Sequence, residues 1–191
     1  MSLDHDATTR RRRMTGLFGR LFARRDGATA IEFAILAIPF FVIIFASIET
    51  FIAFTGEQLL ANATETMARK IRTGEIRATT PNAEQTFRAE FCEEIKILMP
   101  CSGKLFLDVR SFDKYSDIPA AVPLVDMDLD TNSLRFAPGG KKSINIVRAY
   151  YRWDVVTDLV RPLIANIQSA DGSRRNYLMV ATTVVQNEDY P

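Results

Sequence analysis

The sequence predicts an α+β fold, in which an N-terminal transmembrane helix continues into a domain with a second helix and an antiparallel sheet. Three patterns predict it: a long apolar run from residue 31, apolar residues at helical spacing after it, and alternating apolar and polar residues beyond residue 104. Helices that precede strands favour α+β over an alternating arrangement. We divide the 191 residues into a basic leader (1–27), a transmembrane helix (28–55) and an exported domain (56–191).

The basic charge of the chain is concentrated in the leader. Residues 1–27 contain seven arginines and three aspartates, whereas the rest of the chain carries 17 basic and 20 acidic side chains. The only histidine, His5, also lies in the leader, so residues 28–191 lack the imidazole that Ser-His-Asp, Cys-His and histidine-ligated zinc sites need. Nothing aromatic or folded accompanies the four consecutive arginines, so we expect no nucleic-acid partner.

The apolar run from Ile31 to Phe54 is long enough to span a bilayer. It contains 24 residues, and a helix of about 20 residues crosses a hydrocarbon core about 30 Å thick. Because the arginines precede the run and few cations follow it, we expect the N-terminus in the cytoplasm and the later residues on the far side. A buried helix of a soluble protein and a cleaved secretory signal are the alternatives.

The exported domain begins with two helices, each with one apolar face that we expect in the core. The members of these faces are Leu60, Ala63, Met67 and Ile71 in the first helix and Phe87, Phe91, Ile95 and Leu98 in the second. Gly74 is placed to end the first helix. Thr80 and Pro81 are placed to begin the second, which ends before Pro100.

The second half of the domain has the alternation typical of strands. We expect strands over residues 105–110, 125–130, 143–153 and 177–186, with turns at Pro138-Gly139-Gly140 and Asp171-Gly172-Ser173. These strands would form an antiparallel sheet that packs against the first helix.

An acidic repeat in the second strand, Asp126-x-Asp128-x-Asp130, begins like a calcium-binding loop. The match fails further on, because Thr131 stands where the loop needs glycine and Ala137 where it needs glutamate. We interpret the three aspartates as a solvated strand face and expect neither a metal nor a cofactor.

The chain has two cysteines, Cys92 and Cys101, without the spacing of a metal site. In an exported chain one disulfide is the simplest expectation, and two buried thiols are the alternative.

The junction between leader and apolar run carries a specific motif, Arg24-Arg25-Asp26-Gly27-Ala28-Thr29-Ala30-Ile31-Glu32-Phe33. It resembles the prepilin-peptidase site of type IV pilin-like proteins. The resemblance implies cleavage on the cytoplasmic side after Gly27, so that Ala28 becomes the first residue of the mature chain and Glu32 the fifth.

Apart from this resemblance, the position of Glu32 can be explained by electrostatics. A carboxylate at the start of a lipid-embedded helix is costly unless a partner neutralises it. Cleavage would create an α-amino group at Ala28, and in a stack of parallel helices Glu32 of one subunit could pair with the N-terminus of its neighbour. An unpaired Glu32 in the headgroup region is the alternative.

Further features resemble the TadE-like minor pseudopilins of tight-adherence (Flp) type IV pilus systems. They are Pro39, Glu49, the cysteine pair, the segment Val147–Trp153 and the closing segment Gln186–Pro191. The tail departs from the family's expected Asn-Glu-Pro-Tyr ending. Pro39 is expected to kink the span. Glu49 lies about 26 Å along the helix from Glu32, which places it near the outer interface without requiring burial.

The resemblance implies a non-enzymatic protein of the bacterial inner membrane that takes part in pilus assembly, with its C-terminal domain in the periplasm or in the pilus itself. Its implied partners are the prepilin peptidase, the major and other minor pilins, and the pilus assembly platform. An unprocessed single-pass assembly factor is the alternative. A membrane-tethered enzyme or ligand receptor, suggested only by the acidic strand face and by Tyr150, Tyr151 and Trp153, is a third hypothesis.

Overall fold

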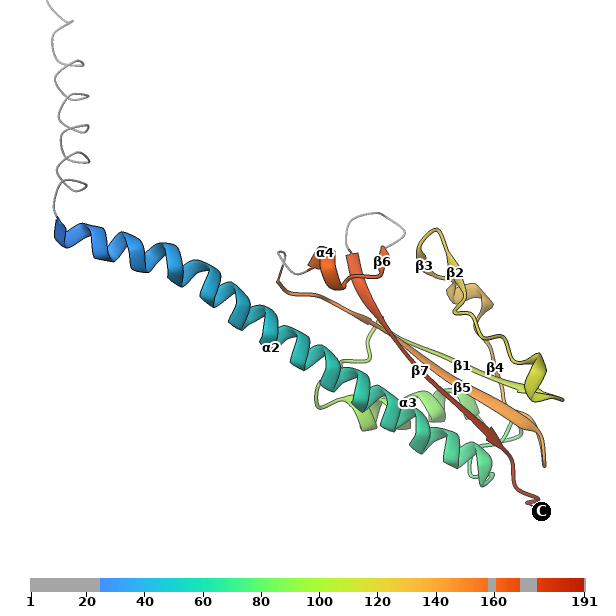
Figure 1. The fold of residues 1–191 in the computed structure, drawn as a ribbon. Helices are drawn as coiled ribbons and strands as arrows, with labels where there is room; N and C mark the ends of the chain where they lie inside the picture. The colour runs from blue at the N-terminus through green and yellow to red at the C-terminus, as the bar shows by residue number, and fades with distance from the viewer. Residues whose placement is uncertain (1–24, 158–160, 169–174, 191) are drawn as a thin grey trace, which may run out of the picture. The chain divides into compact units, whose positions relative to one another are not determined.

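A computed structural model describes residues 25–157, 161–168 and 175–190 of the chain (Figure 1). The chain separates into two compact units, Met1–Ser47 and Ile48–Pro191. Most of the predicted leader and the predicted turn at Asp171-Gly172-Ser173 lie outside the described residues. The α+β class and the long N-terminal helix followed by a second helix are confirmed.

The long helix α2 (Arg25–Arg72) contributes residues from Ile48 onward to the second unit. The four residues predicted to form its inner face are all buried there: Leu60, Ala63, Met67 and Ile71. The helix ends in a Schellman motif, because Gly74 has a left-handed φ of 76° and its N–H donates to the carbonyl of Ile71. The N–H of Glu75 donates to the carbonyl of Lys70 and completes the motif.

The second helix, α3 (Ala83–Ile95), is shorter than the sequence predicts. Phe87, Phe91 and Ile95 are buried as expected. The start at Thr80-Pro81 is wrong, since Asn82 has a left-handed φ of 53° that stops the helix from extending further back. The hydroxyl of Thr80 instead accepts a hydrogen bond from the Arg77 N–H and closes the preceding turn.

Five strands form one sheet in the order β4-β1-β5-β7-β6. Their bounds are Phe136–Ala137 (β4), Leu105–Phe112 (β1), Ile144–Trp153 (β5), Arg175–Gln186 (β7) and Ile167–Gln168 (β6). The β1–β5 and β5–β7 pairs are antiparallel, as predicted. The sheet is nevertheless mixed, because β4 pairs in parallel with β1. The connection between β1 and β4 is long enough for the chain to turn back, so β4 runs beside Val109 and Arg110 in the same direction as β1.

The predicted strand over residues 125–130 is instead a small hairpin of β2 (Leu124–Val125) and β3 (Asp128–Leu129). Asp126 and Met127 both have positive φ values, 50° and 63°, which is the backbone of a tight two-residue hairpin turn. Three single turns complete the described structure: η1 (Tyr115–Asp117), η2 (Thr131–Ser133) and α4 (Arg161–Ile164).

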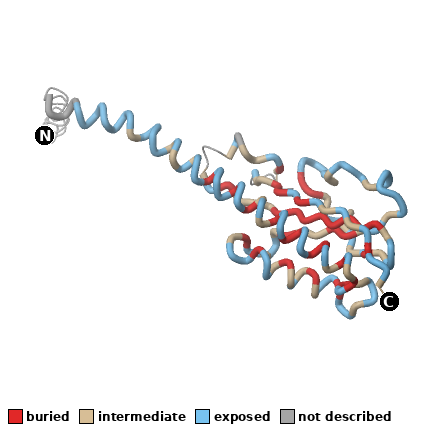
Figure 2. The backbone as a smooth tube through the Cα atoms, turned by 60° about the horizontal axis from the view of Figure 1, so that its bottom comes forward, coloured by how far each residue is buried: buried red, intermediate tan, exposed pale blue. Residues whose placement is uncertain are grey.

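The core of the second unit lies between the helices and the sheet. Buried side chains of α2 and α3 join the inward-facing residues of β1, β5 and β7 in one cluster. Figure 2 colours the buried residues red, and they recur along these helices and strands. A smaller cluster lies on the opposite face of the sheet, where Tyr150 packs with Leu129, Ile167 and Leu178. Alternate residues of each central strand therefore face two different apolar layers.

Candidate functional site

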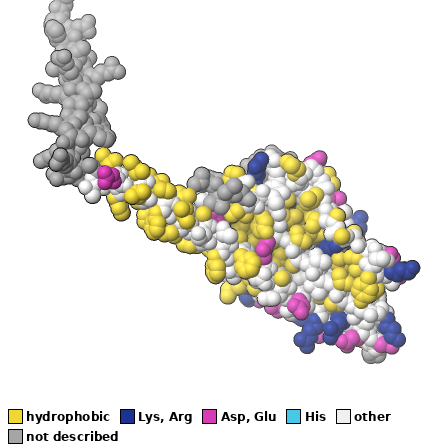
Figure 3. Space-filling view, viewed as in Figure 1, with side chains coloured by type: hydrophobic (Ala, Val, Ile, Leu, Met, Phe, Trp, Pro, Cys, Tyr) yellow, Lys and Arg dark blue, Asp and Glu magenta, His cyan; other side chains and the backbone are white. Residues whose placement is uncertain are grey.

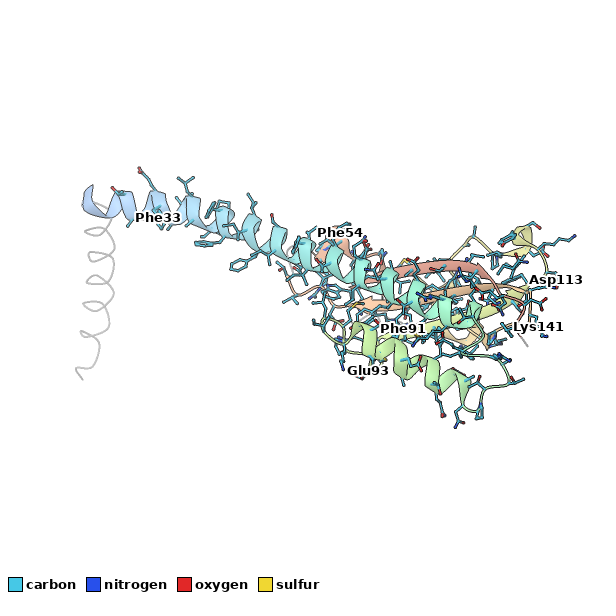
Figure 4. The ribbon with its side chains drawn as sticks, turned by 90° about the horizontal axis from the view of Figure 1, so that it is seen from below. Phe33, Phe54, Phe91, Glu93, Asp113 and Lys141 are labelled. Carbon is cyan, nitrogen blue, oxygen red and sulfur yellow. A yellow bond between two sulfur atoms is a disulfide. The ribbon has the colours of Figure 1, made fainter. Side chains whose placement is uncertain are left out.

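The apolar segment of α2 is exposed over most of its length. An 18-residue window of the helix Thr29–Arg72 has a mean hydropathy of 2.5 with no residue buried, and it is the one described helix able to span a membrane. Yellow side chains cover this segment in Figure 3, and Figure 4 labels Phe33 and Phe54 on the helix. Phe33 is 72% exposed and Phe54 is 58% exposed. Such a surface needs lipid or other apolar helices around it, which suggests membrane anchoring.

Hydroxyl groups in this segment are satisfied by the helix backbone. Ser47 Oγ donates to the carbonyl of Ile43 and Thr55 Oγ1 to that of Phe51, each at 2.8 Å. Pro39 lies inside the helix and has no N–H to donate to the carbonyl four residues earlier. Hydroxyls bonded in this way and a proline are both tolerated in membrane helices.

The predicted processing segment lies in the first turns of α2. The backbone is helical from Arg25, so Gly27 and Ala28 are both helical residues, and Glu32 is an exposed residue just over one turn beyond Ala28. Among the side chains that the structure describes, none forms an ion pair with Glu32. Gly27, Ala28, Glu32 and Pro39 thus share one helix, and their roles in processing and assembly stay predictions.

Glu49 is buried in the described structure, which the expected position near the outer interface did not require. Its side chain is 8% exposed and accepts hydrogen bonds from the backbone N–H groups of Val156 and Thr157, the latter at 3.0 Å. The segment that follows β5 is therefore attached to α2 through one carboxylate. No sequence pattern indicated this contact, because every residue except proline has a backbone N–H and residue type therefore does not reveal which one binds Glu49.

The same segment is held from its other side by Arg161, whose guanidinium donates to the carbonyl of Val155 at 2.8 Å. Val155 itself is buried. The segment is therefore held both through backbone donors, at Val156 and Thr157, and through a backbone acceptor, at Val155.

About two turns beyond Glu49, α2 approaches the sheet closely at Gly56. A Cβ atom there would lie 3.4 Å from the side chains of Trp153 and Met179, so only a very small residue fits without displacing them. Beside it, the hydroxyl of Tyr177 donates to the carboxylate of Glu57. Burial, and then the Glu57 carboxylate, raise the pKa of Tyr177 to about 12.

The C-terminal segment packs against the other end of α2. The N–H of Glu188 donates to the carbonyl of Arg72 at 2.9 Å, and the Asn187 side chain donates to the carbonyls of Gly139 and Gly140. Tyr190 lies over Gly74 and stacks beneath the Arg77 guanidinium, which is 4.3 Å from its ring centre. The closing segment thus has a structural role at the end of the helix.

Cys92 and Cys101 form a disulfide with a Cα–Cα distance of 5.8 Å. It joins α3 to the segment that leads into β1, next to the side chains of the main core. Tyr151 is close by, since its hydroxyl donates to the carbonyl of Pro100 at 3.0 Å.

The three aspartates of the acidic repeat have separate structural roles. Asp128 is buried and accepts two hydrogen bonds from Arg152 Nη2, at 2.9 and 3.0 Å, so it does not belong to a solvated strand face. Asp130 caps η2 by accepting from the Asn132 N–H, and Asp126 lies in the hairpin turn. Within the described ranges, no group of three or more His, Cys, Asp or Glu side chains could hold a metal ion.

Comparison with known protein families shows a similarity in the N-terminal half of the described structure. Residues 27–69 match the family model described as TadE-like protein, which confirms for this segment the family indicated by the sequence. No curated protein and no solved structure matches the chain. The matched segment begins at Gly27 and includes Glu32, Pro39 and Glu49, and it suggests a role in the tight-adherence pilus system.

Proposed function

We propose that this protein is a minor pseudopilin that takes part in the assembly of a tight-adherence (Flp/Tad) type IV pilus after cleavage by a prepilin peptidase following Gly27. The observation that carries the proposal is the Gly27-x4-Glu32 motif at the head of an exposed apolar helix, within the segment that matches the TadE-like family. Residues 28–55 then anchor the chain in the bacterial inner membrane, and residues 56–191 form the exported domain in the periplasm or in the pilus.

Cleavage explains the otherwise costly position of Glu32. A carboxylate at the edge of the hydrocarbon region is stabilised by a nearby cation, and the described side chains provide none for it. A new amine at Ala28 of a neighbouring subunit supplies that cation. The pair also fixes the axial register between parallel helices, because only one stagger brings the two charges together.

The exposed apolar surface supports a role in a helix bundle. Most side chains between Phe33 and Phe54 are exposed in the described structure, so pilin helices or lipid can cover them. The partners that we propose are the prepilin peptidase, the major and other minor pilins, and the assembly platform. The role is one of assembly and not of catalysis, in keeping with a family that is in general non-enzymatic.

The test is the mass and N-terminal sequence of the protein extracted from its native membrane, with and without the peptidase. We expect a chain that begins at Ala28 when the peptidase is present and a full-length chain when it is absent. A Gly27→Leu variant should remain uncleaved beside an active peptidase, while a Thr29→Ser variant, changed two residues away, should be processed normally.

A chain that keeps its leader in the presence of the peptidase would overturn this proposal. It would favour the alternative of an unprocessed single-pass assembly factor. The helical backbone at Gly27 and Ala28 is the observation behind that alternative, because the bond to be cut lies within regular helix.

A further inference from the structure

The sheet of the second unit has one long open edge. On one side, β7 pairs with β5 from Tyr177 to Gln186. On the other side, β6 pairs only with Arg175 and Asn176. Within the described part of the chain, no strand pairs with the outer edge of β7 beyond these two residues. About seven residues, from Val180 to Gln186, are therefore open over about 20 Å.

The hydrogen bonds around this edge show which backbone groups point outward. Leu178 N–H donates to Asn166 Oδ1 at 2.7 Å, and the Asn166 amide donates back to the Leu178 carbonyl, so Leu178 faces away from β5. Since backbone groups alternate along a strand, the N–H and C=O groups of Val180, Thr182 and Val184 face the same way. The Asn166 side chain pairs with Leu178 as a neighbouring strand would, and the edge beyond it is left open.

The two faces beside this edge differ in chemistry. On the helix side a groove of about 540 Å³ lies between α2 and β7, lined by Asn62, Glu65, Thr66, Arg69, Arg72 and residues 183–185 of the strand. On the opposite face, Val180 and Val184 are 40% and 38% exposed. A strand laid along the edge would therefore meet polar and charged groups on one side, and two valines with the exposed Thr182 between them on the other.

We propose that the open edge of β7 binds an extended segment of a partner protein, which adds a strand to the sheet. The backbone of the segment pairs with Val180, Thr182 and Val184. Its side chains alternate, with apolar residues covering the two valines and polar or charged residues entering the groove beside Glu65 and Arg69. An unpaired strand edge is a template for another strand, and side chains on alternate positions supply the specificity.

A second copy of this chain does not fit as the partner through two-fold pairing of the β7 edges. β7 runs in the same direction as α2, because Tyr177 contacts Glu57 and Glu188 contacts Arg72. A two-fold axis would reverse one copy, so the Ile48 ends of the two domains would lie at opposite ends of the joined sheet. Apolar helices that begin from both ends could not enter one membrane.

The proposal is tested by photo-cross-linking of the full chain in its native membrane. A benzoylphenylalanine placed at Val180 reports on the edge, and one at Ile97, which is 87% exposed beyond the end of α3, is the control. We expect one discrete adduct from the edge position, with its attachment point mapped by mass spectrometry to an alternating segment of another protein. The Ile97 position should not give this adduct.

Two substitutions distinguish strand addition from mere proximity. Thr182→Pro removes an outward N–H without removing a β5 hydrogen bond, and Val184→Lys places a charge on the apolar side of the edge. Each should lower the adduct yield about tenfold, whereas Thr182→Ser should not change it. Formation of the Cys92–Cys101 disulfide and resistance to protease check that the variants fold. If the Thr182→Pro variant does not fold, the result for Val184→Lys decides the test.

Three results would overturn the proposal: no adduct from Val180, an adduct whose yield neither substitution lowers, or an attachment point within a second copy of this chain. None of them depends on cleavage after Gly27. A failed cross-linking experiment therefore does not contradict the proposed function. Equally, a chain that keeps its leader does not contradict strand addition at β7.

Discussion

The carboxylate of Glu49 accepts the backbone N–H of Thr157, more than one hundred residues later in the chain, at 3.0 Å. With the neighbouring N–H of Val156, it attaches the segment after β5 to the point where α2 enters the second unit. A glutamate at the end of an apolar run is thereby a structural residue of the domain.

Replacing Glu49 should loosen that segment. Glu49→Ala leaves two N–H groups without an acceptor, and we expect a loss of about 2–3 kcal/mol in the free energy of unfolding. Amide hydrogen exchange at Val156 and Thr157 should accelerate as well. Glu65→Ala, at an exposed position on the same helix, is the matched control and should change stability by less than about 0.5 kcal/mol. If the Val156 and Thr157 amides exchange equally slowly in Glu49→Ala and in Glu65→Ala, Glu49 does not have this role.

Replacing Gly74 with alanine should destabilise the protein more than replacing Gly103, although the two glycines have similar φ values. Gly74 and Gly103 have φ values of 76° and 70°, but a Cβ at Gly74 would lie 2.7 Å from the Tyr190 ring, whereas nothing lies within 4 Å at Gly103. Gly103→Ala should cost about 1–2 kcal/mol for the left-handed backbone alone. Gly74→Ala should cost clearly more, as measured by denaturant unfolding.

The excess cost at Gly74 should depend on the C-terminal segment. Introducing Gly74→Ala into a Tyr190→Ala background removes the ring that the new methyl group meets, so the two substitutions should show a coupling energy. If their costs simply add, Tyr190 does not pack on the end of α2 as described.

Stability should fall at alkaline pH through Tyr177. The pKa of this hydroxyl is raised from 10.0 to about 12, first by burial and then by Glu57, so the folded state disfavours its ionised form. The contribution is fully present below pH 10 and is lost as pH rises from 10 toward 12, because the unfolded chain releases the proton first. Tyr151 has the same direction and value, through burial and then Asp154.

Thermal unfolding of the wild type and of Tyr177→Phe between pH 8 and pH 12 checks this effect. The variant should lose stability less steeply above pH 10, while Tyr115→Phe, at an exposed position, should follow the wild type. Identical slopes for Tyr177→Phe and the wild type would show that this hydroxyl titrates alike in the folded and unfolded states.

The features that could be predicted from the sequence depend on the periodicity of side chains. The inner face of α2, the apolar face of α3 and the long strands β5 and β7 follow from apolar residues that recur at helical or alternate positions. Local backbone geometry escaped prediction at Asp126 and Met127, where two left-handed residues without glycine turn an expected strand into a hairpin.

Long-range contacts to backbone atoms escaped prediction for a different reason. The acceptors and donors that Glu49 and Asn187 contact belong to the main chain, and every residue type carries the same ones. The motif around Gly27 and Glu32 could be recognised because its spacing is specific, yet no side chain that the structure describes forms an ion pair with Glu32.

Glu32 provides the sharpest test of the assembly role. In the proposed bundle its carboxylate pairs with the Ala28 amine of a neighbouring subunit, so Glu32→Gln, which keeps the shape and removes the charge, should be cleaved after Gly27 but should support far fewer pili. A buried pair that loses one charge leaves the other uncompensated, at a cost of about 3–5 kcal/mol.

Counting pili on cells and sequencing the N-terminus of the variant separate assembly from processing. Glu84→Gln, at an exposed position on α3 away from the apolar segment and from the groove beside β7, should assemble normally. Normal piliation by a cleaved Glu32→Gln protein would mean that its charge does not register the helices, and Glu32 would then be a headgroup-level residue of the anchor.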